Sequence, residues 1–192
     1  MDRQTLIDAP RELFSERLVL QAPRAEHAAA FVDSLNRSLP GLAFIGWGQK
    51  LRDLDWAQRF CTDGAAMVDN GECLIFNAFL RGEGDAADRY VGRIDLHTFD
   101  FEAPRCEVGY VGDVLSAGRS LMREAVLAVI GLGFDIGLMR IHALSDARNE
   151  RALRFAGALG MQREGLLRAF ERDAQGQLCD MMMFAAFNPS LA

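Results

Sequence analysis

The stretch Val114-Leu-Ser-Ala-Gly-Arg-Ser-Leu-Met-Arg-Glu-Ala-Val126 decides the interpretation of this chain. A strand-like run, Cys106-Glu-Val-Gly-Tyr-Val111, leads through a glycine-bearing turn directly into an amphipathic helix. The first turn of a helix has free backbone N–H groups and a partial positive charge, so it favours an anion. Gly118 lets the backbone approach that anion closely. Three side chains of the turn can add donors: Ser116, Arg119 and Ser120. The segment is therefore a candidate phosphate-binding turn.

The composition is that of a globular protein, because 50% of the 192 residues are hydrophobic and 25% are charged. We expect one domain over residues 1–192, with residues 1–14 as a loosely packed lead-in. The net charge of -6 argues against nucleic acid as a partner. No apolar run is long enough to cross a membrane, and the N-terminus lacks the apolar run of a signal peptide. The expected location is therefore cytoplasmic.

The cysteines and histidines indicate neither a disulfide framework nor a metal site. None of the four cysteines forms a Cys-x-x-Cys pair, so buried free thiols in a reducing compartment are expected. His27, His97 and His142 are widely separated and show no metal-ligand spacing. We expect no metal.

Hydrophobic periodicity predicts an alternation of helices and strands. The predicted strands are 17–21, 72–80, 90–99, 105–111, 139–144, 161–172 and 178–187. The predicted helices are 25–35, 54–69, 118–132 and 146–159. Residues 38–48 and 81–88 are expected to be irregular. Gly131 and Gly133 are expected to supply the left-handed cap of the third helix, and Gly160 that of the fourth. Residues 173–176 have the composition of a hairpin turn.

This order predicts an α/β (α+β) fold with a mixed central sheet of about seven strands, mostly antiparallel, and helices on both faces. The strands 105–111 and 139–144 are joined through a helix, so they should be parallel, with a right-handed crossover. Antiparallel pairs flank this one β-α-β unit.

Four local motifs, in this order, resemble those of the GNAT acetyltransferases, and more narrowly of the RimJ/RimL branch, which acetylates protein N-termini and some small amines. They are Ser15-Glu-Arg-Leu18, Cys106-Glu-Val-Gly-Tyr110, Gly118-Arg-Ser-Leu-Met-Arg-Glu-Ala125, and Asn149-Glu-Arg followed by Leu159-Gly-Met161. The resemblance covers nearly the whole chain. It implies the GNAT fold and direct transfer of an acetyl group from acetyl-CoA to a primary amine. Dimers are frequent in this branch, so a homodimer is one expected assembly.

The resemblance also implies how the donor is bound. The strands 105–111 and 139–144 splay apart, pantetheine and the thioester lie in the opening, and backbone N–H groups of residues 115–120 bind the pyrophosphate. The expected cofactor-binding residues are Val111, Val114, Leu115, Ser116, Ala117, Gly118, Arg119, Ser120 and Asn149. Asn149 can equally be a plain helix cap. The chain departs from the family pattern at Leu115, Ser120, Ala152 and Phe184. These departures motivate an alternative, a non-catalytic acyl-CoA-binding protein of the same fold.

Acetyl transfer to an amine needs a base, a polarised thioester oxygen and a proton for the leaving thiolate. Glu107 matches the glutamate of this branch and is the candidate base, acting through water, with a pKa raised by burial. The alternative to a catalytic role is an exposed strand glutamate paired with an arginine such as Arg93 or Arg105. Tyr110 is a candidate proton donor, although a strand tyrosine more often serves packing. Ser116, Ser120 and water are open alternatives for that role.

The acceptor pocket has three candidate residues: Trp47, Arg168 and Asp180. Trp47 lies between two glycines and suits either a mobile pocket wall or a core anchor. Arg168 and Asp180 can line the pocket or form a surface pair. A third, unrelated reading is a nucleotide-binding α/β domain, but the turn lacks the lysine of Gly-x-x-x-x-Gly-Lys-Ser/Thr, and Gly-x-Gly-x-x-Gly is absent.

Overall fold

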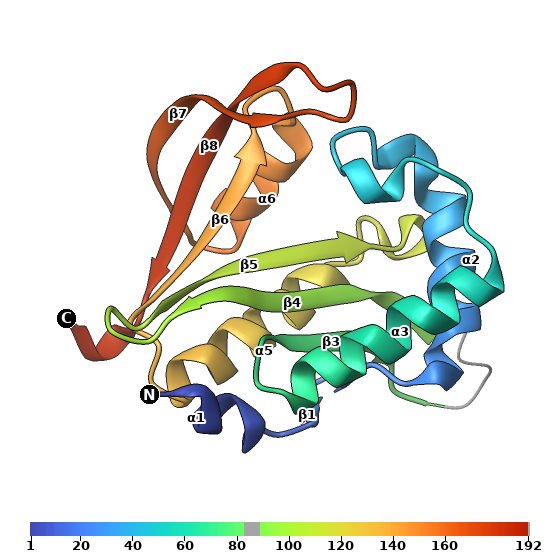
Figure 1. Ribbon diagram of the computed structural model, residues 1–192, viewed down its shortest axis with the longest axis horizontal. Coiled ribbons are helices and arrows are strands. Elements are labelled where there is room, and N and C mark those ends of the chain that lie inside the picture. Colours follow the sequence, from blue (N-terminus) through green and yellow to red (C-terminus); the bar gives the residue numbers. More distant parts are fainter. Residues whose placement is uncertain (83–88, 192) are drawn as a thin grey trace.

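The computed structural model describes residues 1–82 and 89–191, which form a layered α/β fold around one sheet (Figure 1). The sheet has eight strands in the order β1-β2-β3-β4-β5-β6-β8-β7. The strands are β1 (Glu12–Phe14), β2 (Leu18–Gln21), β3 (Leu74–Leu80), β4 (Tyr90–Asp100), β5 (Arg105–Gly112), β6 (Arg140–Asp146), β7 (Gln162–Arg172) and β8 (Leu178–Phe187). The α-helices are α1 (Arg3–Ile7), α2 (Ala28–Ser38), α3 (Leu54–Asp69), α5 (Leu121–Asp135) and α6 (Glu150–Ala158). Short 3-10 turns are η1 (Ala25–His27), η2 (Leu39–Gly41), η3 (Gly46–Gly48), η4 (Val114–Ser116) and η5 (Pro189–Leu191).

The sheet is antiparallel except at β5 and β6, as the sequence predicted. These two strands pair in parallel through only three residue pairs, the last of which is Glu107 with His142. Beyond that pair they diverge, and Figure 1 shows β6, β7 and β8 rising away from β5. The diverging strands are the feature that positions the site.

Two apolar cores hold the helices on opposite faces of the sheet. Leu121, Ala125 and Val129 of α5 are fully buried in one core together with the strand residues Cys106 and Val108. The α2–α3 pair covers the other face in a second core that contains Phe31, Ala57, Cys61, Phe79 and Tyr90. Side chains alternate along a strand, so Glu107 and Gly109 point away from α5, toward the face that α2 and α3 partly cover.

The N-terminal segment is packed and not loose as expected. Leu6 of α1 is fully buried in the main core, and Ala9 is 6% exposed. Residues 12–14 pair with β2 and add an eighth strand to the roughly seven predicted. The short β1 shows too little alternation to be recognised from sequence.

The helix α5 begins and ends later than predicted. It starts at Leu121, because η4 and a turn occupy 114–120, and it runs through Gly131 and Gly133 to Asp135. The left-handed residue beyond its end is Gly137, with φ of 106°. A Cβ atom at Gly133 would lie 2.7 Å from Cδ1 of Ile141, whereas at Gly131 nothing lies within 4 Å. Gly133 therefore serves close packing of the helix on β6.

Several local predictions are confirmed. Gly160 follows α6 with φ of 81°, and the hairpin turn is closed by the Gly176 N–H, which donates to the Asp173 carbonyl at 2.8 Å. The four cysteines are buried and free. Residues 83–88 of the predicted loop lie outside the described residues. No helix within 1–82 and 89–191 is long and apolar enough to cross a membrane.

Candidate active site

Two adjoining hollows lie where β5 leaves β6. The first has a volume of about 410 Å³ and runs between the end of β5, the helix α6 and the segment 38–45. The second has a volume of about 400 Å³ and lies over the turn 113–120 and the start of α5. Both hollows are lined by Gly112, Val114 and Arg151, so they form one elongated site with an apolar half and a half beside the turn.

The amides of the turn divide into an occupied and a free set. The N–H of Val114 donates to Oγ of Ser38 at 3.0 Å, and that of Leu115 to Oδ1 of Asp113 at 2.8 Å. The N–H groups of Ser116 and Ala117 donate to the backbone carbonyls of Asp113 and Val114, each three residues earlier. Within the described chain, the N–H groups of residues 118–123 donate to no acceptor. The amides of 115–117 thus have partners within the chain, those without a described acceptor are 118–123, and the anion contacts expected at 115–120 stay a prediction.

A buried ion pair fixes the base of this turn. The side chain of Asp113 is 1% exposed, and its Oδ2 accepts from Nη2 of Arg37 at 2.6 Å and from Nε at 2.9 Å. Arg37 and Ser38 are the last residues of α2, so the end of that helix holds residues 113 and 114 directly. A carboxylate beneath an anion site would oppose binding, and the Arg37 guanidinium compensates that charge.

The turn contains two left-handed residues. Gly118 has φ of 75°, which glycine adopts at no steric cost, and a Cβ there would meet nothing within 4 Å. Ser120 has φ of 60° and ψ of 11°, and its side chain makes no capping hydrogen bond. Ser120 is thus strained at the position where the resembled family usually has glycine or alanine.

Glu107 lies at the apex of the diverging strands, between two histidines. His97 is its partner on β4 and His142 its partner on β6, and Nε2 of His142 is 3.7 Å from Oε2 of Glu107. Burial raises the pKa of Glu107, with Glu171 and Asp95 adding to the shift and His97 opposing it. Burial also lowers the pKa of His142, as do the cationic Arg140 and Arg105. Both shifts favour uncharged side chains.

The structure does not show Glu107 paired with Arg93 or Arg105, which was the alternative to a catalytic role. Arg105 pairs with Asp100 at 3.1 Å, and the guanidinium of Arg93 lies 4.7 Å from the ring centroid of Phe60. Glu107 instead has a side chain that is 22% exposed and faces the histidines. Its proton can therefore exchange with water while its charge stays poorly solvated.

Tyr110 lines the first hollow, and its ring packs against Phe155 of α6 at 5.0 Å between centroids. Its hydroxyl is buried and has no hydrogen-bond partner among the described residues. Burial raises the pKa of Tyr110 to about 12, so the hydroxyl keeps its proton at neutral pH. A buried orphan hydroxyl is available to a bound molecule.

Asn149 caps α6, which is one of the two roles expected for it, and the other role, a contact to the pantetheine arm, stays a prediction. Its Oδ1 caps α6 by accepting from the Ala152 N–H at 3.2 Å, and the residue also lines the first hollow. Val111 and Ala152 line the same hollow. Leu115 and Arg119 line neither hollow, and the Leu115 side chain is 67% exposed.

Two of the acceptor candidates, Arg168 and Asp180, line neither hollow. Asp180 accepts from the Ala169 N–H at 2.8 Å and holds a bulge of β7, where Ala169 has φ of 49°. Arg168 is an exposed residue of the same strand, and among the described residues it forms no pair with Asp180. Trp47 belongs to η3, and its side chain lies outside the described part of the structure.

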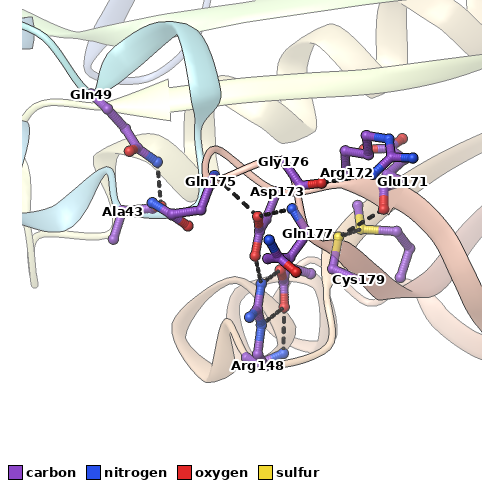
Figure 2. Close-up of polar contacts among 12 residues, drawn as sticks. Ala43, Gln49, Arg148, Glu171, Arg172, Asp173, Gln175, Gly176, Gln177 and Cys179 are labelled. Carbon is purple, nitrogen blue, oxygen red and sulfur yellow. Dashed lines mark hydrogen bonds and ion pairs between the residues drawn. The ribbon is translucent and has the colours of Figure 1, made fainter.

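Arg148 contacts three segments of the chain: the end of β6, the turn of the β7–β8 hairpin and the loop that contains Phe44 (Figure 2). Its guanidinium pairs with Asp146 at 2.6 Å and with Asp173 at 3.0 Å, and it lies 5.8 Å from the ring of Phe44. Asp173 also accepts from two backbone N–H groups of the hairpin turn. Figure 2 shows Gln175, at the tip, beside the segment of Ala43 and Gln49.

Sequence reasoning missed Arg37, Asp113, Arg148 and Arg151. Arg37 and Asp113 are 76 residues apart, so no local pattern could join them. Within the described ranges, no three His, Cys, Asp or Glu residues lie together as a metal site would require.

Residues 17–162 match the family model described as the acetyltransferase (GNAT) domain. The chain belongs to the GNAT family. The resemblance of its motifs to that family is thereby confirmed. A curated relative, the uncharacterized N-acetyltransferase p20 of Bacillus licheniformis, is 34% identical over 99 residues. That match covers 51% of this chain and 55% of the relative, so the chain spans about half the length of that relative.

Solved structures share the GNAT fold at low identity. The microcin C7 self-immunity acetyltransferase MccE, in complex with acetyl-CoA and AMP, has a TM-score of 0.80 and 16% identity, over 90% of this chain and 93% of that one. RimL, the ribosomal L7/L12 alpha-N-protein acetyltransferase in complex with coenzyme A, has a TM-score of 0.78 and 16% identity, over 93% and 97%. These likenesses confirm the fold class.

Proposed function

We propose that the protein is an N-acetyltransferase that moves an acetyl group from acetyl-CoA to a primary amine, a protein N-terminal α-amine or a small amine. The observation that carries this proposal is the elongated site itself. It has amides without a described acceptor at one end and a mostly apolar lining at the other; Glu107 lines neither hollow but belongs to the last residue pair before β5 and β6 part. The family membership and the coenzyme complexes of MccE and RimL support the donor.

The residues present fit such a donor. Amides 118–123 face no acceptor among the described residues and suit a diphosphate, and the first hollow is mostly apolar, as a pantetheine arm requires. When bound, the donor supplies the activated acyl group. Asn149 lines the hollow with its amide nitrogen still able to donate, since only its oxygen caps α6.

Glu107 is the proposed base, acting through water. The acceptor ammonium loses a proton to Glu107, the amine nitrogen forms a bond to the acetyl carbon, and the carbon–sulfur bond breaks. The new amide nitrogen then gives up its second proton to water, so that a neutral amide and a thiolate remain. A raised pKa brings Glu107 closer to working pH, which suits a general base. Tyr110 is the proposed donor of a proton to the thiolate, because the residue lines the hollow and its protonated, buried hydroxyl has no partner among the described residues.

The alternative is a non-catalytic acyl-CoA-binding protein. The strained Ser120 and the absence of a hydroxyl at Ala152 favour it. A thermal shift with acetyl-CoA, CoA, ATP and NAD tests both readings, since a ligand stabilises the folded state it binds. Stabilisation by ATP or NAD but not by CoA would contradict both.

Release of free thiol with a panel of amines then separates an enzyme from a sensor. For an enzyme, Glu107→Gln should lower kcat/KM by at least about 10²-fold, the usual contribution of a positioned base. A loss smaller than about tenfold would show that Glu107 is not the base. Binding of CoA without thiol release for any amine would favour the sensor.

A further inference from the structure

Arg151 is shared by the two halves of the elongated site. It belongs to the first turn of α6 and lines both hollows. A Cβ atom placed on Gly41 would lie 3.2 Å from Nη1 of Arg151. Gly41 belongs to η2, on the wall formed by residues 38–45, so the guanidinium reaches from α6 to the facing wall.

The guanidinium of Arg151 has no counter-ion in the described part of the chain. Neighbouring arginines are engaged: Arg37 with Asp113, Arg148 with Asp146 and Asp173, Arg154 with Glu150, and Arg123 with the Ala158 carbonyl. Arg151 makes no hydrogen bond or ion pair to any described residue. A planar guanidinium at the mouth of a cavity, without a carboxylate, presents its donors to an anion.

The turn on the opposite side supplies no cationic side chain. The family loop usually begins with glutamine or arginine at the position of Leu115, and Leu115 lines neither hollow. Arg119, the other basic residue of the turn, lines neither hollow either. The amides of 114–117 are also occupied within the protein. A diphosphate at this turn would therefore meet free amides but no charge from the turn itself.

We propose that Arg151 binds the diphosphate of CoA from the side of α6, so that the anion is held between this guanidinium and the free amides of 118–123. The inference rests on the proposed function, because it assigns a ligand contact within the same site. Gly41 is the residue that leaves room for the guanidinium. The planar fork of arginine can donate to two oxygens at once, which lysine cannot do.

Calorimetric titration of CoA, dephospho-CoA and pantetheine tests the proposal. Dephospho-CoA keeps the diphosphate and lacks the 3′-phosphate, and pantetheine lacks both. Arg151→Gln should raise the Kd of CoA and of dephospho-CoA alike by about 10-fold to 100-fold, the loss of one charge-assisted contact. The Kd of pantetheine should not change. Arg151→Lys should fall between wild type and Arg151→Gln.

Arg59→Gln is the matched control, because Arg59 is an exposed helical arginine that lines neither hollow and its loss changes net charge equally. A second test is Gly41→Ala, which should weaken CoA binding in the wild type and have no further effect in Arg151→Gln.

The outcomes separate the two proposals. If the wild type binds no CoA, the proposed function fails. If the wild type binds CoA and Arg151→Gln binds it equally well, the inference alone is overturned. A loss for CoA but not for dephospho-CoA would place Arg151 on the 3′-phosphate and overturn the diphosphate contact.

Discussion

Nη2 of Arg37 lies 2.6 Å from Oδ2 of Asp113, at the base of the turn that opens α5. The same carboxylate accepts from the Leu115 N–H, so one buried charge joins the end of α2 to the turn. Because the Asp113 side chain is 1% exposed, this contact differs from the surface pairs of the molecule. Several consequences for stability can be measured.

Asp113→Asn keeps the shape of the side chain and an oxygen for the Leu115 N–H, but removes the partner charge of Arg37. We expect a loss of about 2–4 kcal/mol in the free energy of unfolding, since breaking a buried pair leaves an uncompensated charge. Urea denaturation at neutral pH measures it. Glu150→Gln is the control, because the Arg154–Glu150 pair is exposed on both sides and should contribute no more than about 0.5 kcal/mol. Equal losses in the two variants would refute a buried role for Asp113.

Ser120→Gly should stabilise the protein by about 1 kcal/mol. The reason is the left-handed backbone conformation of Ser120, which is energetically unfavourable for any residue with a Cβ atom. The Ser120 side chain makes no capping hydrogen bond that would offset this strain. Thermal unfolding of the two forms checks this. Ser116→Gly should instead destabilise, because Ser116 is buried and has an ordinary helical backbone. A destabilised Ser120→Gly would mean that the strain is not present.

Gly131 and Gly133 occupy the same helix and should respond oppositely to alanine. Gly131→Ala should stabilise by about 0.5–1 kcal/mol, because alanine favours the helix and its Cβ would meet nothing. Gly133→Ala should destabilise by about 1–3 kcal/mol, because its Cβ would overlap Ile141. The denaturant midpoints of the two variants, compared with that of the wild type, measure both effects. If both variants gained stability, the close approach of α5 to β6 would be wrong.

Glu107→Gln should stabilise the protein at neutral pH while it lowers activity. The pKa of Glu107 is raised above its ordinary value of 4.5 by burial, so the folded state favours the protonated form. Wild type therefore loses stability as pH rises through that raised pKa, and glutamine, which does not titrate, does not. Melting temperatures from pH 4 to 8 should diverge with rising pH in favour of the variant. Parallel curves would show that Glu107 is well solvated.

The order of elements and the parallel pair followed from local patterns. Hydrophobic alternation revealed the strands, and the run from Cys106 to Val126 placed the turn before α5. What could not be predicted depends on distant partners. The occupied amides of 114 and 115 required Ser38 and Asp113, and the role of Gly133 required the neighbouring Ile141. Charge alone could not show that Arg151, among so many arginines, has no counter-ion in the part of the chain that the structure describes.

The joint between β5 and β6 consists of three residue pairs, from Arg105 with Arg140 to Glu107 with His142. The sheet thus consists of two groups of strands, β1–β5 and β6–β8, that are joined by this short stretch of pairing. A molecule bound where the two strands diverge contacts both groups of strands and holds them in place relative to each other. Hydrogen exchange of the backbone amides at the carboxyl ends of β5 and β6 should then slow when a ligand binds, although neither strand pairs with a new strand of the chain.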